Sequence, residues 1–139
     1  MKTRFLTLLL FMWPSLALAS TGIDIKLNHG SVWRTTKTGQ TTEGFLEIHN
    51  DGKNADTLTG FQCSIAATTS LVGGNGKPLN SLAIPAGKTI TLSVDGPHLV
   101  LHGLHYTVDH GSILPCAFTF QEAGDIGGYL NAVPAPRKH

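Results

Sequence analysis

The stretch EGFLEIHNDG, residues 43–52, decides how the chain is expected to fold. Within it, Leu46 and Ile48 fall on one face of an extended strand, and Glu47 and His49 fall on the other. The Asn-Asp-Gly triplet that follows is a strong turn signal. The sequence therefore predicts a half-buried β-strand that ends in a tight turn.

The same alternation, punctuated by turn residues, continues on both sides of this strand. Further strands are predicted at residues 23–27, 58–65, 82–84, 89–94, 98–101, 113–120 and 129–133. Residues 66–81, with a glycine-rich run at 73–76 and Pro78, are predicted to form an exposed loop. Gly103 is expected to break the strand that begins at His98. About seven to eight short strands with little helical periodicity predict an all-β fold, a β-sandwich.

Residues 1–19 have the features of a secretory signal peptide. Lys2 and Arg4 precede an apolar run, and the small residues up to Ala19 predict cleavage after that position. The apolar run is too short to span a bilayer. No cysteine follows the cleavage position to carry a lipid anchor. We therefore expect export to a bacterial periplasm, without membrane insertion after cleavage.

The chain that remains after cleavage is long enough for one domain and too short for two. That domain is expected over residues 20–133, with a flexible tail at 134–139. Of the 10 basic residues, two leave with the signal peptide, so that eight face nine acidic ones. This balance indicates no basic patch for nucleic acid. An enzyme is not expected, because no nucleophile in a context such as Gly-x-Ser-x-Gly occurs.

Cys63 and Cys116 are the only cysteines, and an even pair in an oxidising compartment favours a disulfide. Closing a loop of about fifty residues stabilises a fold by roughly 4 kcal/mol on the chain-entropy model. The Cys-x-x-Cys spacing of a redox couple is absent. Residues 117–120 also lack the histidine or methionine that would accompany Cys116 in a blue-copper site. Thiol ligands or free thiols remain the alternatives.

The chain carries an ordered set of short segments, namely Trp33-Arg34, GFLEIHN at 44–50 with the following Asp51-Gly52, ADTL at 55–58, IPAG at 84–87, GPHLVLHGL at 96–104 and FTFQEAG at 118–124. This set resembles the periplasmic copper chaperones of the PCu(A)C family. The resemblance implies a cupredoxin-like β-sandwich that binds copper in the periplasm. It also implies delivery to a copper-accepting periplasmic or membrane protein, with a link to assembly of the copper centre of cytochrome oxidase.

The resemblance further implies a copper site built from two His/Met pairs. His98 matches the histidine of a His-x-Met pair, but Val100 stands at the methionine position. The other pair has no counterpart within residues 64–85. Met1 and Met12 are the only methionines, and both lie in the signal peptide. Because no thioether is available, bound copper is expected as Cu(II) rather than Cu(I).

Other histidines could rebuild a site beside His98. His102 shares a strand face with it but lies about 13 Å away, whereas the i, i+2 spacing of the family pair is about 6.6 Å. A kink at Gly103 would allow His102 and His105 to approach one another. His98, His102 and His105 are therefore the candidate copper ligands. The alternative is a relative that no longer binds metal and serves as a periplasmic protein-interaction module.

Overall fold

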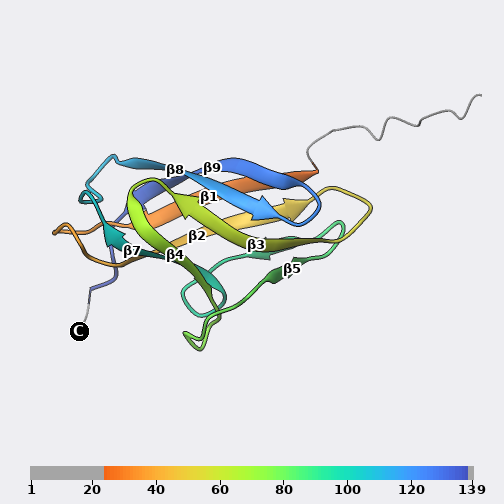
Figure 1. Cartoon of the computed structure of the whole chain (residues 1–139), viewed down its shortest axis with the longest axis horizontal. Helices are drawn as coiled ribbons and strands as arrows, with labels where there is room; N and C mark the ends of the chain where they lie inside the picture. The colour runs from red at the N-terminus through yellow and green to blue at the C-terminus, as the bar shows by residue number, and fades with distance from the viewer. Residues whose placement is uncertain (1–23, 138–139) are drawn as a thin grey trace, which may run out of the picture.

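The structure, a computed structural model, describes residues 24–137, which form nine β-strands and no helix (Figure 1). In chain order the strands are β1 Ile25–Trp33, β2 Thr42–Asn50, β3 Asp56–Cys63, β4 Ala66–Val72, β5 Leu82–Ile84, β6 Thr89–Thr91, β7 His98–Leu104, β8 Ile113–Phe120 and β9 Gly124–Val133. The predicted signal peptide lies outside the described residues. Residues 134–137 of the predicted tail are exposed and carry no strand. Within the described part, no helix is long and apolar enough to cross a membrane.

The strands form one curled, mixed sheet in the order β4-β7-β2-β1-β9-β8-β3-β5, with β6 paired to β2. β1 and β9 run parallel, and the other paired strands run antiparallel. The curl brings β4 back beside β3, where the Thr69 hydroxyl donates a hydrogen bond to the Phe61 carbonyl. The inner side of the sheet thus encloses one core, and the predicted all-β, cupredoxin-like fold is confirmed.

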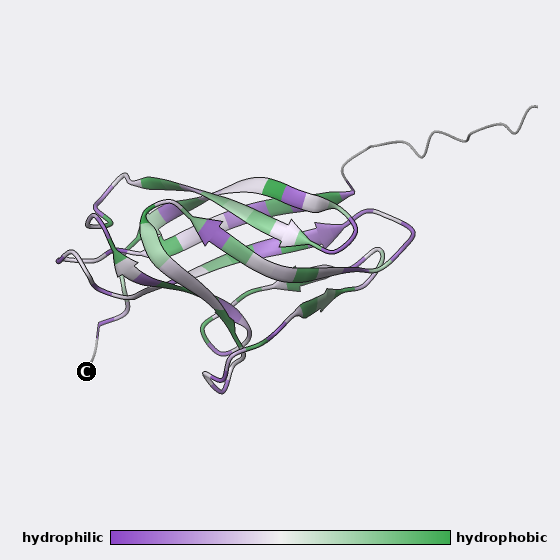
Figure 2. Cartoon of the chain, in the orientation of Figure 1, coloured by the Kyte–Doolittle hydropathy of each residue, from purple (hydrophilic) through white to green (hydrophobic). Residues whose placement is uncertain are grey.

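Alternating burial along the strands builds this core. In β8, Leu114, Cys116, Phe118 and Phe120 are buried, and the residues between them are exposed. Figure 2 shows the corresponding alternation of apolar and polar residues along the ribbons. Phe118 stacks on Phe61 of β3, with 5.8 Å between the ring centroids. Each fully buried Leu or Phe side chain contributes roughly 1.5–3 kcal/mol, so this pattern supplies the main stabilising term.

Several strand predictions are corrected by the structure. β1 continues to Trp33 instead of ending at residue 27, and β6 ends at Thr91 instead of residue 94. β4 occupies residues 66–72 of the predicted loop, because pairing with β7 defines it rather than an apolar pattern of its own. β7 runs through Gly103 without breaking, because glycine accepts the φ of +61° found there. β9 begins at Gly124, earlier than predicted. Within β9, a Cβ on Gly128 would lie 3.0 Å from the Phe118 ring, so the strand keeps a glycine that weakens its sequence signal.

Two buried polar side chains organise the loops at one end of the sheet. The Asp56 carboxylate accepts backbone N–H groups of Glu122 and Ala123, at 2.9 and 3.0 Å, which ties the start of β3 to the β8–β9 turn. The Asn50 amide nitrogen donates to the Ile84 carbonyl at 3.0 Å, joining the end of β2 to β5. Buried polar groups are tolerated when they are hydrogen-bonded, as both of these are.

Candidate metal-binding site

His98, the first residue of β7, is the best-positioned candidate ligand. Its side chain points to the outer side of the sheet, because the next residue, Leu99, faces the core. His98 is nonetheless only 6% exposed. Its Nδ1 lies 2.9 Å from the Gly96 carbonyl oxygen, an acceptor, so Nδ1 carries the proton. In the neutral ring, Nε2 then keeps the free lone pair that a metal needs.

Glu43 of β2 faces that free nitrogen. Its Oε1 lies 3.6 Å from Nε2 of His98, an ion-pair distance rather than a hydrogen bond. The β2–β7 register places Glu43 directly opposite Val100, the position of the missing family methionine. The sequence reasoning did not identify Glu43. Its position opposite β7 follows only from the strand register.

An aromatic row borders the pair on the outer side of the sheet. The rings of Phe45 in β2 and His98 lie 6.0 Å apart between centroids. Trp33 at the end of β1 lies 5.2 Å from Phe45. The Phe45 ring therefore lies beside the imidazole, and Trp33 lies on from Phe45 in the row.

The other two predicted ligands are not brought together with His98. His102 lies further along β7, and its Nε2 is 3.0 Å from the Ser70 hydroxyl of β4. His105 is exposed beyond the end of β7, and its backbone N–H donates to the Ile65 carbonyl. Among residues 24–137, no group of three or more His, Cys, Asp or Glu side chains is placed to hold a metal ion. A ligand role for the three histidines stays a prediction.

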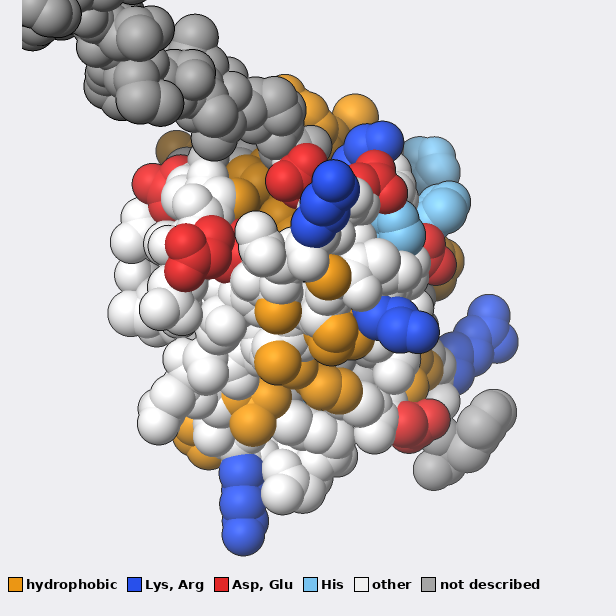
Figure 3. Space-filling view, turned by 90° about the vertical axis from the view of Figure 1, so that its right-hand side faces the viewer, with side chains coloured by type: hydrophobic (Ala, Val, Ile, Leu, Met, Phe, Trp, Pro, Cys, Tyr) orange, Lys and Arg blue, Asp and Glu red, His pale blue; other side chains and the backbone are white. Residues whose placement is uncertain are grey.

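A second histidine network lies on the outer faces of β1 and β2. His29, in a β1 bulge with φ of +55°, places Nδ1 2.9 Å from the Glu47 carboxylate. His49 uses both ring nitrogens, one 2.6 Å from Asp51 and the other 2.6 Å from a threonine hydroxyl of β6. The hydrogen bond from Lys26, at 2.7 Å, lowers the pKa of the Asp51 carboxyl. Figure 3 shows histidine side chains beside basic and acidic ones at one margin of the molecule.

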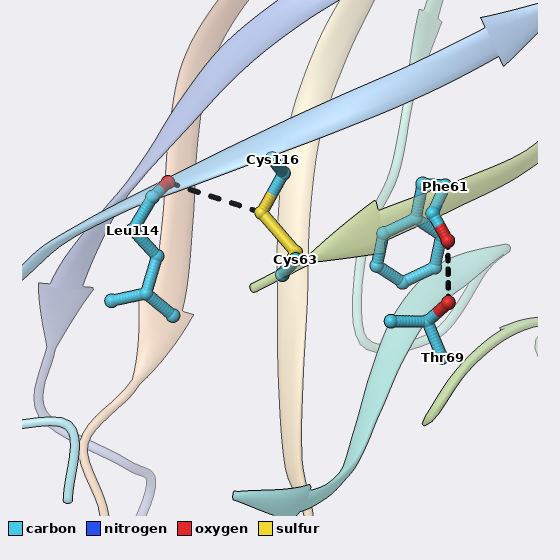
Figure 4. The surroundings of a disulfide bond; sticks show 5 residues. All are labelled: Phe61, Cys63, Thr69, Leu114 and Cys116. Atoms are coloured by element: carbon cyan, nitrogen blue, oxygen red, sulfur yellow. Dashed lines mark hydrogen bonds between the residues drawn. A yellow bond between two sulfur atoms is a disulfide. The ribbon is translucent and has the colours of Figure 1, made fainter. Parts of the chain in front are cut away.

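The favoured disulfide is present. Cys63 of β3 and Cys116 of β8 face each other directly in the strand register, with 4.3 Å between their Cα atoms (Figure 4). Both are buried, at 4% and 6% exposure, on the inner side of the sheet. The bond therefore lies between two strands that are already paired.

Comparison with solved structures shows the same fold in PCuAC domains. The copper-bound PCuAC domain from PmoF2 has 18% identity and a TM-score of 0.71, covering 81% of this chain and 94% of that chain. The apo PCuAC domain from PmoF1 has 18% identity and a TM-score of 0.74, covering 81% and 95%. The solution structure of CuI-DR1885 from Deinococcus radiodurans has 19% identity and a TM-score of 0.62, covering 84% of each chain.

Sequence comparison adds a family. The family model described as "Putative lipoprotein LpqE-like" matches residues 25–128, which is most of the described chain. No curated protein matches the sequence. The structural comparison thus gives the fold and the sequence comparison gives the family. Neither identifies copper ligands in this chain, which follow only from its own residues.

Proposed function

This chain belongs to the LpqE-like family, and we propose from that premise that it is an exported, periplasmic copper-binding protein. It is similar in fold to domains that include a copper-bound one. In this proposal one copper ion is held at His98 and passed to a copper-accepting protein of the periplasm or the membrane. Assembly of a cytochrome oxidase copper centre is the delivery step that the family resemblance suggests.

The orientation of the His98 ring carries the proposal. Metal-binding histidines commonly donate the second ring N–H to a backbone carbonyl, which fixes the tautomer and directs the other nitrogen to the metal. His98 makes that hydrogen bond to Gly96. A carboxylate oxygen of Glu43 lies beside the free nitrogen and offers a second donor. One imidazole and one carboxylate suit Cu(II), and no thioether is present to favour Cu(I).

The test is a competition titration of the disulfide-intact chain, without its signal peptide, with Cu(II). We expect one Cu(II) per chain, with binding weakened at least about tenfold, or 1.4 kcal/mol, by His98→Ala. Glu43→Gln should weaken it less, because the imidazole is kept. His110→Ala is the matched control, since this histidine is exposed in the turn before β8 and should leave the titration unchanged. Binding that survives His98→Ala would contradict the proposal.

A second candidate function rests on three exposed apolar side chains. Tyr106, Ile113 and Tyr129 are 72%, 60% and 67% exposed. Ile113 and Tyr129 project from the outer faces of the neighbouring strands β8 and β9. Exposed aromatic residues of this kind are enriched at protein interfaces. A folded chain that holds no Cu(II) above the buffer level would favour a periplasmic interaction module that uses this surface.

A further inference from the structure

The disulfide-bonded cysteines hold the only sulfur atoms in the described part of the chain. The sequence has two cysteines and two methionines, and both methionines precede residue 13. Cu(I) prefers soft sulfur ligands, which the His98 site lacks. We propose that reduction of the Cys63–Cys116 disulfide creates a Cu(I) site, with the two thiolates as ligands. This site is separate from His98 and does not depend on the function proposed above.

The strand register holds the two side chains together whether or not the bond between them is closed. Cys63 and Cys116 are a directly facing pair in an antiparallel ladder, with 4.3 Å between Cα atoms. Such pairs carry their side chains on one face at short separation. The neighbouring pair Phe61 and Phe118 stays in register and stacks its rings at 5.8 Å. Opening the disulfide therefore leaves two thiols side by side on a paired framework.

An open hollow gives access to this pair. It is lined by both cysteines and mainly by small residues, among them Ser64, Ala66 and Ala117. A small dithiol reductant can therefore approach the disulfide from this side. The cysteines themselves are only 4% and 6% exposed, so contact is restricted to this opening.

The surroundings also suit a reduced state. Cys116 Sγ lies 3.9 Å from the Leu114 carbonyl oxygen, as Figure 4 shows. A disulfide sulfur has no proton to donate, so in the oxidised chain this is only a contact. The thiol of reduced Cys116 carries a proton, and the same carbonyl is in place to accept it.

The Cu(I) site forms in two steps, reduction of the disulfide and binding of the metal. A dithiol reductant, such as a thiol–disulfide oxidoreductase, gives two electrons and two protons to the disulfide, producing two protein thiols and its own disulfide. One Cu(I) ion then displaces one proton from each thiol and binds both thiolates, giving a bis-thiolate complex of charge −1. Oxidation of the thiolates back to the disulfide removes both ligands. The redox state of one bond would thus decide whether the chain retains Cu(I).

The experiment compares oxidised and reduced chain without oxygen. The disulfide is reduced under native conditions with dithiothreitol, the reductant is removed, and thiols are counted with Ellman's reagent. Cu(I) is then titrated in competition with bathocuproine disulfonate. The controls are reduced chain alkylated with iodoacetamide, the double variant Cys63→Ser/Cys116→Ser, and reduced His98→Ala. Circular dichroism checks that each sample keeps its β-sheet.

We expect two thiols per chain after native reduction and one Cu(I) bound at least about 100-fold more tightly than by the oxidised chain. Alkylation and the double variant should abolish the gain, and His98→Ala should leave it intact. Equal Cu(I) retention by reduced, oxidised and alkylated chain would overturn the inference. So would a disulfide that resists native reduction, or a reduced chain that unfolds. If the gain is lost in His98→Ala alone, the copper belongs to the His98 site instead.

Discussion

The β2–β7 and β3–β8 strand pairs carry the two candidate copper sites proposed for this domain, and they differ in ligand type and in the side of the sheet on which the ligands lie. At β2–β7, His98 and Glu43 meet on the outer side of the sheet. At β3–β8, Cys63 and Cys116 meet on the inner side and are bonded to each other. The first pair has nitrogen and oxygen donors available as it stands. The second has sulfur donors that are unavailable until the bond is reduced.

The difference shows how one sheet can separate hard or borderline ligands from soft ones. Imidazole and carboxylate suit Cu(II), and thiolates suit Cu(I). Because successive residues of a strand face opposite sides, the phase of each strand decides which ligand type lies outside and which lies in the core. Variants that remove or exchange ligands on one side should therefore leave the other side unchanged.

The largest expected effect is loss of the disulfide. Cys63→Ser/Cys116→Ser should lower the free energy of unfolding by roughly 4 kcal/mol, because the bond closes a long loop in the unfolded chain. The sequence separation of the two cysteines is 53. Chemical denaturation, monitored by circular dichroism, measures this. Cu(II) binding at His98 should not change, and a parallel loss of Cu(II) binding would show that the two sides are not independent.

Asp56 should give the next largest effect, because it anchors the disulfide-bearing side. Asp56 is 7% exposed, and Asp56→Ala leaves the backbone N–H groups of Glu122 and Ala123 without their acceptor. A loss on the order of 3 kcal/mol in the free energy of unfolding is expected. Asp125→Ala is the matched control, since Asp125 is exposed and contacts a single threonine hydroxyl. Equal losses in the two variants would contradict the anchoring role.

Val100→Met should raise the affinity of the His98 site for Cu(I), because it adds a thioether ligand. Val100 shares the outer face of β7 with His98 and lies opposite Glu43. A thioether there restores a His-x-Met pair, so Cu(I) affinity of the oxidised chain should rise roughly tenfold, or 1.4 kcal/mol. Ile113→Met, which adds a thioether on exposed β8, should give no gain. Competition with a Cu(I) chelator measures both, and equal gains would show that any added thioether suffices.

Much of the fold could be predicted because apolar and polar residues alternate along most strands, just as their side chains alternate between the core and the solvent. The strand within 43–52 and the turn after it were found from local pattern alone, and so was β8. β4 was missed because its alanine, threonine and serine residues carry no apolar alternation. Its place depends on pairing with β7, a contact between segments distant in the sequence. A strand could therefore be predicted where one of its faces is buried and the other is exposed. It could not be predicted where only backbone pairing with a distant strand defines it.

The candidate site could be predicted only in part, for the same reason. His98 was identified from its segment, and the cysteine pair from count and compartment. Glu43 could not be paired with His98, because that contact depends on the β2–β7 register. His102 was grouped with His98 because the two share a strand face, yet its ring nitrogen is directed to Ser70 of β4, the strand that was not predicted. Because the strand pairing was not known from the sequence, the predicted set of copper ligands omitted Glu43 and included His102.

The smallest expected effect concerns the exposed ion pair of Lys26 and Asp51, at 62% and 40% side-chain exposure. Lys26 lowers the pKa of Asp51 in the folded chain, so the contribution of Asp51 is present above the unfolded carboxyl pKa of about 3.9 and is lost as pH falls through the folded value. Asp51 raises the pKa of Lys26, so that contribution is present below about pH 10.4 and is lost as pH rises through the folded value.

A double-mutant cycle with Lys26→Met and Asp51→Asn should therefore show a small stabilising coupling at neutral pH and low salt. Removing either partner separately also changes contacts such as that of His49, and the cycle subtracts those effects. The coupling should weaken as pH falls below about 3.9, through the lowered pKa of Asp51, and it should be lost in about 1 M salt, where the Debye length is about 3 Å. Thermal melts of the four proteins measure it. A coupling that persists in high salt would mean that this outer surface is less open to solvent than its exposure indicates. The outer and inner sides of the sheet would then differ in their copper ligands and not in the exposure of their ion pairs to solvent.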